Sequence, residues 1–150
     1  NIYLGRDFIM SEYLNPCVTA DIIIERREEL LLIKRAIEPF RDMWAFPGGH
    51  LNYGDETVEE TGVRELFEET GLRAKVSDLE LIGVYSEPGR DPRGHYVTCA
   101  YVARNFRGEI MAKDDARDVR FFPMDNLPEL AFDHEKILMD YITKFKGGVK

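Results

Sequence analysis

The chain has 150 residues, of which 44% are hydrophobic, and its formal net charge at pH 7 is −8. This length predicts a single domain over residues 1–150, and a negative charge of this size argues against binding of a nucleic-acid polymer or a membrane surface. Because no apolar segment reaches the roughly 20 residues of a membrane helix and no basic stretch precedes an apolar one at the start, we expect a soluble, cytoplasmic protein.

The first third of the chain is predicted to be mostly strand. Residues 1–16 alternate only weakly between apolar and polar side chains and are interpreted as an edge strand or a leader. Residues 17–25 are rich in β-branched side chains and lead through a polar Arg-Glu-Glu segment into residues 30–35, a pattern that predicts a β-hairpin. A further strand is predicted at residues 43–46, and it should end in a sharp turn at the Pro-Gly-Gly segment of residues 47–49.

The strongest helical pattern covers residues 56–70. Apolar side chains recur there at spacings of three to five residues, and Gly71 is placed to end the helix. Gly62 is unusual inside this pattern, since a glycine in a helix interior costs about 1 kcal/mol relative to alanine unless close packing requires it.

The second half of the chain is predicted to alternate strands with loops and to end in a helix. Strands are predicted at about residues 79–85, 96–103 and 119–122, and a helix at residues 134–145 with Asp133 as its N-cap. Because only two substantial helices stand among these strands, the sequence favours an α+β fold with a mixed sheet over a doubly wound parallel sheet.

Both cysteines, Cys17 and Cys99, lie inside apolar stretches and not at metal-ligand spacing. A disulfide framework or a zinc site is therefore not expected, and both thiols are predicted to be reduced and buried. Trp44 also lies in an apolar strand, so its ring is expected to belong to the core and not to stack on a base.

Three glutamates, Glu65, Glu68 and Glu69, lie at positions i, i+3 and i+4 of the predicted helix. This spacing places their carboxylates on one face within one turn, where they repel one another at the negative end of the helix dipole. A cation between the acids would offset this repulsion, and hard oxygen ligands suit Mg²⁺, with Mn²⁺ as an alternative. A solvated helix face is the competing interpretation of the same acids.

The segment around these acids, GGHLNYGDETVEETGVRELFEETGL, resembles the signature of the Nudix hydrolase family. That signature is Gly, five residues, Glu, seven residues and then Arg-Glu-U-x-Glu-Glu-x-Gly-U, where U is a bulky aliphatic residue. Residues 56–72 match it throughout, whereas six residues in place of five separate Gly49 from Glu56. Either the loop carries one extra residue or Asp55 shares the role of Glu56.

The resemblance implies an α/β/α sandwich around a mixed β-sheet and a magnesium-dependent enzyme that hydrolyses a nucleoside diphosphate linked to another moiety. The implied metal ligands are three carboxylates and one backbone carbonyl: Glu65, Glu68, Glu69 and Gly48. An ion pair between Arg64 and Glu56 would orient this segment, and Gly49 and Gly71 would support it at its two ends.

The family also uses a carboxylate outside this segment, just before a late strand, as general base or additional metal ligand. Asp118 fits that place best, with Asp115 and Glu87 as rivals. Metal ions would neutralise the phosphate oxygens and lower the pKa of the attacking water. Each of the three acids is alternatively a plain surface residue.

Substrate choice is indicated by segments outside the signature. Pro88 follows Leu72 by 16 residues, which is similar to the proline of the ADP-ribose pyrophosphatase subgroup. The segments DPRGH and LAFDHEKI also look like members of that subgroup. The implied reaction is hydrolysis of ADP-ribose to AMP and ribose 5-phosphate, and because the subgroup often forms homodimers, a homodimer is an open expectation.

Arg90 and Arg93 are candidate phosphate-binding residues, because planar guanidinium groups form paired hydrogen bonds with phosphate oxygens. They fit a solubilising role in their loop equally well. His50 is a candidate substrate contact, against the alternative of a neutral loop histidine. His95 and His134 fit local roles at a strand start and in a first helical turn, and no chemistry is assigned to them.

Two other functions stay open at this point. A MutT-like (d)NTP pyrophosphohydrolase would release pyrophosphate from a nucleoside triphosphate. A non-catalytic nucleotide-sensing module of the same fold would regulate a partner, and such modules are expected to lose the signature glutamates that this chain has.

Overall fold

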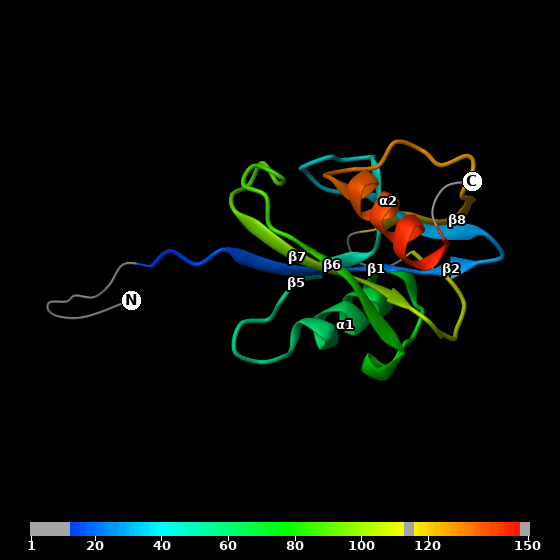
Figure 1. Ribbon diagram of the computed structural model, residues 1–150, viewed down its shortest axis with the longest axis horizontal. Coiled ribbons are helices and arrows are strands. Elements are labelled where there is room, and N and C mark those ends of the chain that lie inside the picture. Colours follow the sequence, from blue (N-terminus) through cyan, green and yellow to red (C-terminus); the bar gives the residue numbers. More distant parts are fainter. Residues whose placement is uncertain (1–12, 113–115, 148–150) are drawn as a thin grey trace, which may run out of the picture.

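Two sheets lie between two helices in the computed structural model, which describes residues 13–112 and 116–147 (Figure 1). The first sheet is mixed and has the strand order β5-β1-β7-β6. In that order its strands are Gly48–His50, Cys17–Ile23, Tyr96–Ala103 and Leu79–Tyr85. β1 runs parallel to β7 and antiparallel to β5, and β6 is antiparallel to β7.

The second sheet is antiparallel and is centred on β3. Its strands are β2 (Glu25–Arg26), β3 (Glu29–Arg35), β4 (Trp44–Ala45) and β8 (Ala116–Pro123). The predicted hairpin is only partly correct, because β3 pairs with the short β2 while β1 pairs with β5 and β7. β1 is apolar along most of its length, and pairing on both edges buries it more completely than a hairpin would.

The turn between β2 and β3 is formed by Arg27 and Glu28, whose φ angles are 53° and 62°. Positive φ at both central residues is typical of the two-residue hairpin turns whose twist matches that of the flanking strands. The chain can therefore reverse here and enter the second sheet directly after β1.

The helices cover opposite sides of the strands (Figure 1). They are α1 (Val58–Thr70) and α2 (His134–Phe145), and a short 3₁₀ helix, Val76–Asp78, precedes β6. Successive side chains of β1 point to opposite faces of the sheet and belong to two hydrophobic cores. Ile22 packs in the cluster that contains Leu66 of α1, and Ile23 packs in the cluster that contains Ile137 of α2. The expected α/β/α sandwich is thus confirmed, although the strands form two sheets and not one.

Close packing explains the glycine inside α1. A Cβ atom on Gly62 would lie 2.7 Å from Cδ1 of Ile22, so a larger residue would require the Ile22 side chain to shift. The helix begins at Val58, two residues later than predicted, because Thr57 serves as its N-cap.

Two local predictions were wrong, and a third was correct in position. Gly48 and Gly49 do not form a sharp turn but belong to β5. Cys17 is exposed, because it is the first residue of β1 at the open end of the sheet, while Cys99 is half-buried. Asp133 is the N-cap residue of α2, as predicted, although its side chain makes no capping bond.

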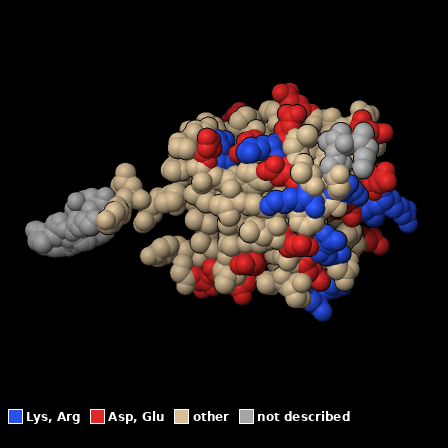
Figure 2. Space-filling model, in the orientation of Figure 1, with Lys and Arg blue, Asp and Glu red and all other residues tan. Residues whose placement is uncertain are grey.

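Trp44 belongs to the core, as predicted: its ring packs on Phe122 with centroids 4.8 Å apart. The interpretations of residues 1–12 and of Asp115 fall outside the described residues. Over the described residues of the face in Figure 2, Lys and Arg side chains are interspersed with Asp and Glu and form no continuous basic surface. Within residues 13–112 and 116–147, neither helix has the length and apolar character needed to cross a bilayer.

Candidate active site

Both ends of α1, which carries the candidate acids, are fixed by local hydrogen bonds. Thr57 Oγ1 accepts a hydrogen bond from the Glu60 N–H (3.1 Å), and the Glu60 carboxylate accepts one from the Thr57 N–H (2.8 Å). At the other end Gly71 adopts φ 84°, and its N–H donates to the Phe67 carbonyl oxygen (2.9 Å). These hydrogen bonds fix where α1 begins and ends, and they thereby fix the positions of Glu65, Glu68 and Glu69 along it.

The Arg64 guanidinium connects three acids. Its Nε and Nη2 atoms donate to Glu56 at 3.0 Å and 2.7 Å, and its Nη1 atom donates to Glu65 at 3.0 Å and Glu68 at 3.1 Å. Nη2 also donates to the backbone oxygen of His50 (2.8 Å), which ties α1 to β5. The predicted ion pair between Arg64 and Glu56 is confirmed, and the same guanidinium reduces the repulsion between Glu65 and Glu68.

Glu56, and not Asp55, makes the contacts that the sequence signature predicts. Besides Arg64, the Asn52 N–H (3.0 Å) and the Thr61 hydroxyl (2.6 Å) donate to its carboxylate. The Arg64 hydrogen bond and these two further donors lower the pKa of Glu56 to about 2. The additional loop residue therefore leaves the supporting interaction intact.

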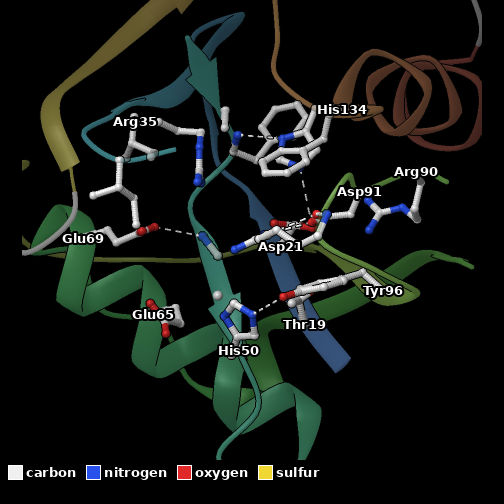
Figure 3. A pocket seen from close by; sticks show the side chains of 18 residues that line it. Thr19, Asp21, Arg35, His50, Glu65, Glu69, Arg90, Asp91, Tyr96 and His134 are labelled. Atoms are coloured by element: carbon white, nitrogen blue, oxygen red, sulfur yellow. Dashed lines mark hydrogen bonds and ion pairs between the residues drawn. The ribbon is translucent and has the colours of Figure 1, made fainter. Parts of the chain in front are cut away.

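Glu69 lines a cavity beside β5 (Figure 3). Its Oε1 atom accepts a hydrogen bond from the Gly48 N–H (2.9 Å), and the residue is only 8% exposed. Burial raises the pKa of Glu69 well above its usual value, and the nearby Glu65 and Asp21 carboxylates raise it further. The Gly48 hydrogen bond and the Arg35 guanidinium lower the pKa of Glu69 but do not offset the effect of burial.

Close backbone approach explains the two glycines of β5. A Cβ atom on Gly48 would lie 2.2 Å from the Ala20 carbonyl oxygen and 2.3 Å from Asp21 Oδ1. A Cβ atom on Gly49 would lie 2.3 Å from the carboxylate carbon of Glu65. At Gly48 the obstacle is the backbone of β1, so only glycine fits there, whereas a larger residue at position 49 would displace the Glu65 carboxylate.

The floor of the cavity contains residues that the sequence analysis missed. Asp21 is 8% exposed and accepts a hydrogen bond from the Thr98 hydroxyl (2.6 Å). His134 Nδ1 accepts the Phe46 N–H (3.1 Å), so Nε2 carries the proton and faces Asp21 Oδ2 at 3.8 Å. Burial lowers the pKa of His134, so this imidazole is neutral at pH 7. The available signal was an aspartate inside the apolar stretch of β1, because buried acids require partners.

The opposite wall comes from the loop between β6 and β7 and from the start of α2. Arg90, whose side chain is 5% exposed, donates to Asp133 through Nε (2.9 Å) and Nη2 (2.6 Å). Arg93 donates to Asp91 through Nε (3.1 Å) and Nη2 (2.8 Å). Both predicted arginines line the cavity, and each is held by a carboxylate of its own.

His50 also lines the cavity, where its Nε2 lies 3.2 Å from the Tyr96 hydroxyl oxygen (Figure 3). Burial and the nearby Arg93 guanidinium lower the pKa of His50, so the ring is neutral near pH 7. A neutral imidazole at this position can exchange hydrogen bonds with a substrate without adding charge.

Of the predicted base candidates, Asp118 and Glu87 belong to the described residues, and neither lines the cavity. Asp118 lies on β8, where it accepts hydrogen bonds from the Val119 N–H (2.8 Å) and Arg120 Nε (2.9 Å), and it does not line the cavity. Glu87 lines a separate groove between β6 and α2. Neighbouring residues of β8 donate to the Asp118 carboxylate, which the sequence pattern alone does not reveal.

The chemistry of the site fits a divalent cation, although the side chains do not form a preassembled cage. Within the described part of the chain, no three His, Cys, Asp or Glu side chains converge as metal ligands. Arg64 holds Glu65 and Glu68 on one side, while Glu69 turns toward β5. A cation beside Glu65 and Glu69 would supply the charge that the buried Glu69 carboxylate lacks, and oxygen donors of this kind suit Mg²⁺ or Mn²⁺.

The backbone oxygen of Gly48 is available to the same cation. The Ile22 N–H donates to the Pro47 carbonyl oxygen (2.9 Å), which sets the hydrogen-bonded pairs of the ladder between β1 and β5. In an antiparallel ladder the intervening residue directs its backbone groups away from the partner strand. The Gly48 N–H accordingly binds Glu69, and the Gly48 carbonyl lies outside the ladder.

Comparisons with known proteins identify the family of the chain. Residues 15–141 match the model of the NUDIX domain. The chain is 52% identical, over 136 residues, to an ADP-ribose pyrophosphatase of Methanocaldococcus jannaschii, and the matched part covers 91% of this chain and 78% of that protein.

Two solved structures are similar to this one. A MutT/nudix family protein from Enterococcus faecalis has a TM-score of 0.83 and 29% identity, covering 94% of this chain and 66% of that one. The NUDIX domain of Shewanella oneidensis NrtR, complexed with ADP ribose, has a TM-score of 0.79 and 26% identity, covering 88% of this chain and 90% of that one.

Proposed function

Because the chain belongs to the Nudix hydrolase family, we propose that its cavity binds ADP-ribose and hydrolyses it to AMP and ribose 5-phosphate with the help of Mg²⁺. The observation that carries this proposal is the division of one cavity into an acidic wall at Glu65 and Glu69 and an arginine wall at Arg90 and Arg93. The 52% identity to an ADP-ribose pyrophosphatase supports the choice of substrate.

The acidic wall would hold the metal. Glu65, Glu69 and the Gly48 carbonyl are the nearest donors, and Glu68 can join them if Arg64 releases it. When bound, the metal supplies charge neutralisation at the diphosphate and a lowered pKa for the attacking water. Arg64 and Glu56 hold the end of α1 against β5, so the donors keep their places as the metal arrives.

The arginine wall would hold the diphosphate. Asp133 and Asp91 fix the two guanidinium planes before substrate arrives, which reduces the ordering that binding requires. Their free N–H groups can donate to phosphate oxygens, and His50 lies between the two walls as a neutral hydrogen-bonding group. The proton acceptor predicted at Asp118 stays a prediction, as do a homodimer and a cytoplasmic location.

The experiment is a substrate screen with product identification. The chain is incubated with ADP-ribose and with a panel of dNTPs in Mg²⁺ and in Mn²⁺, and products are resolved by chromatography. We expect AMP and ribose 5-phosphate from ADP-ribose, with slower release of pyrophosphate from the dNTPs. Fast dNTP cleavage beside negligible ADP-ribose cleavage would identify the MutT-like activity instead.

One observation favours a second function, a nucleotide-sensing module. A similar solved structure is the domain of NrtR bound to ADP ribose. Binding of ADP-ribose with no AMP formed at any concentration of Mg²⁺ or Mn²⁺ would establish this function for the chain. The presence of Glu65, Glu68 and Glu69 together argues for catalysis.

A further inference from the structure

The segment of residues 131–134 forms one edge of the cavity and is fixed at both of its ends. The Ala131 N–H donates to the Trp44 carbonyl oxygen (2.7 Å), and His134 Nδ1 accepts the Phe46 N–H (3.1 Å). These two hydrogen bonds hold the segment beside β4 and beside Phe46, the residue that follows β4. Phe132 lies between these two attachments and lines the cavity.

The backbone of Phe132 is strained. Its φ angle is 53°, in the left-handed region that bulky side chains rarely adopt. With this backbone conformation, neighbouring side chains point in different directions. Asp133 binds Arg90 and His134 is buried beside Asp21, whereas the Phe132 ring lines the cavity. Strain of this kind persists where the surrounding structure imposes it, and it concentrates at ligand sites.

The Phe132 ring is bordered by cations and by a second ring. The guanidinium carbons of Arg35 and Arg93 lie 4.9 Å and 5.7 Å from its centroid. The Phe40 ring packs on it at 4.7 Å with an interplanar angle of 59°, from a position that does not line the cavity. The His134 ring also lies near it, with the two centroids 5.5 Å apart. Phe132 thus contributes an apolar ring to a cavity that is otherwise rich in charged groups.

We propose that Phe132 is the stacking surface for the adenine base of the substrate. The inference rests on the proposed function, because the base is the one part of ADP-ribose with a broad apolar face. Aromatic rings and guanidinium planes both stack on bases. Phe132 would hold the base, and the diphosphate would extend from there toward Glu65 and Glu69.

Arg93 must move for a base to enter between its guanidinium and the ring. Two stacked contacts of about 3.5 Å each exceed the present separation of 5.7 Å. Arg93 is part of the loop between β6 and β7 and is held there by Asp91. Because Asp91 holds Arg93 in this position, the base would stack on Phe132 without entering between the ring and the Arg93 guanidinium.

The test compares two products that differ by the base. Isothermal titration in the absence of metal measures the binding of AMP and of ribose 5-phosphate to the wild-type chain and to Phe132→Ala, Phe132→Leu and Phe132→Trp. Loss of the stacked ring should weaken AMP binding about tenfold or more in the Ala and Leu variants. Ribose 5-phosphate binding should change by less than about twofold, and Phe132→Trp should bind AMP at least as tightly as the wild-type chain.

Phe40→Ala is the matched control, because it removes an equal side chain that supports Phe132 from outside the cavity. Its AMP affinity should stay within about threefold of wild type. Equal losses in Phe40→Ala and Phe132→Ala, or equal losses for both products, would show that Phe132 only supports the fold. Phe132→Leu keeps the apolar bulk, so it reports on stacking even if Phe132→Ala does not fold.

Failure of this inference can be distinguished from failure of the proposed function. A wild-type chain that binds AMP through Phe132 but does not cleave ADP-ribose would overturn the function alone. If the wild type cleaves ADP-ribose and Phe132→Leu has an unchanged KM and AMP affinity, the function stands and the stacking role is wrong.

Discussion

The two walls of the cavity contain similar numbers of charged groups but pair them in different ways. On the acidic wall, one guanidinium, Arg64, is shared by three acids, and Glu69 is left with a backbone N–H. On the opposite wall each arginine has its own carboxylate, Asp133 for Arg90 and Asp91 for Arg93.

This difference indicates what each wall can bind. The acidic wall has more negative than positive charge, so its electrostatic energy falls when a cation arrives. The arginine wall is nearly neutral as a whole, so it holds donors in fixed positions more than it attracts anions from a distance. Binding at the acidic wall should therefore depend mainly on the charge of the metal. Binding at the arginine wall should depend mainly on the positions of the guanidinium groups.

The largest expected effect comes from Glu69→Gln, which removes the charge of the acidic wall without changing its shape. Turnover of ADP-ribose in Mg²⁺ should fall roughly a hundredfold or more, with an unchanged circular dichroism spectrum. Burial raises the pKa of Glu69, so the metal-free variant should be at least as stable as the wild type. Glu59→Gln, the same change in the first turn of α1, is the control, and near-wild-type turnover in Glu69→Gln would contradict the assignment.

Arg64→Ala tests whether the shared guanidinium organises the acidic wall. Several charge-assisted hydrogen bonds are lost at once, so the free energy of unfolding should fall by about 2 kcal/mol and turnover by at least about tenfold. Urea denaturation and steady-state kinetics measure the two effects. Loss of stability with full activity would show that Arg64 supports the fold but not the metal site.

Asp133→Asn tests the arginine wall. Arg90 would lose its charged partner but keep its place near the cavity, so KM for ADP-ribose should rise about tenfold while kcat stays within about threefold. A fall in kcat with constant KM would instead assign this wall to the reaction step and would remove the distinction between the two walls. Arg117→Ala, which breaks an ion pair with Asp42 away from the cavity, is the control.

The smallest expected effect is a change in how the free energy of unfolding depends on pH in acidic solution. The folded-state pKa of Glu56 is about 2, below its ordinary value of 4.5, so this carboxylate stabilises the fold above pH 4.5 and loses that contribution as the pH falls toward 2. In Glu56→Gln the free energy of unfolding should depend less steeply on pH between 4.5 and 2. Equal slopes in chemical denaturation at a series of pH values would refute this contribution.

The local features of the acidic wall were readable in the sequence because they depend on residues close together in the chain. The helix, its Gly71 cap, the ion pair of Arg64 with Glu56 and the positions of the three glutamates all follow from spacings of a few residues. The strand at residues 79–85 and the final helix were also correctly predicted, since their patterns are strongly periodic.

The sequence by itself therefore determined the family, the layered α+β fold and the acidic end of α1. Only the tertiary structure decided that Glu69 turns into a cavity while Glu68 does not, and that Asp21 and His134 meet beneath it although 113 positions separate them in the chain. Such long-range pairs are set by strand order and by the packing of α2, which no local spacing encodes. The same reason explains why Arg90 proved to be a partner of Asp133 and why Phe132 reached the cavity.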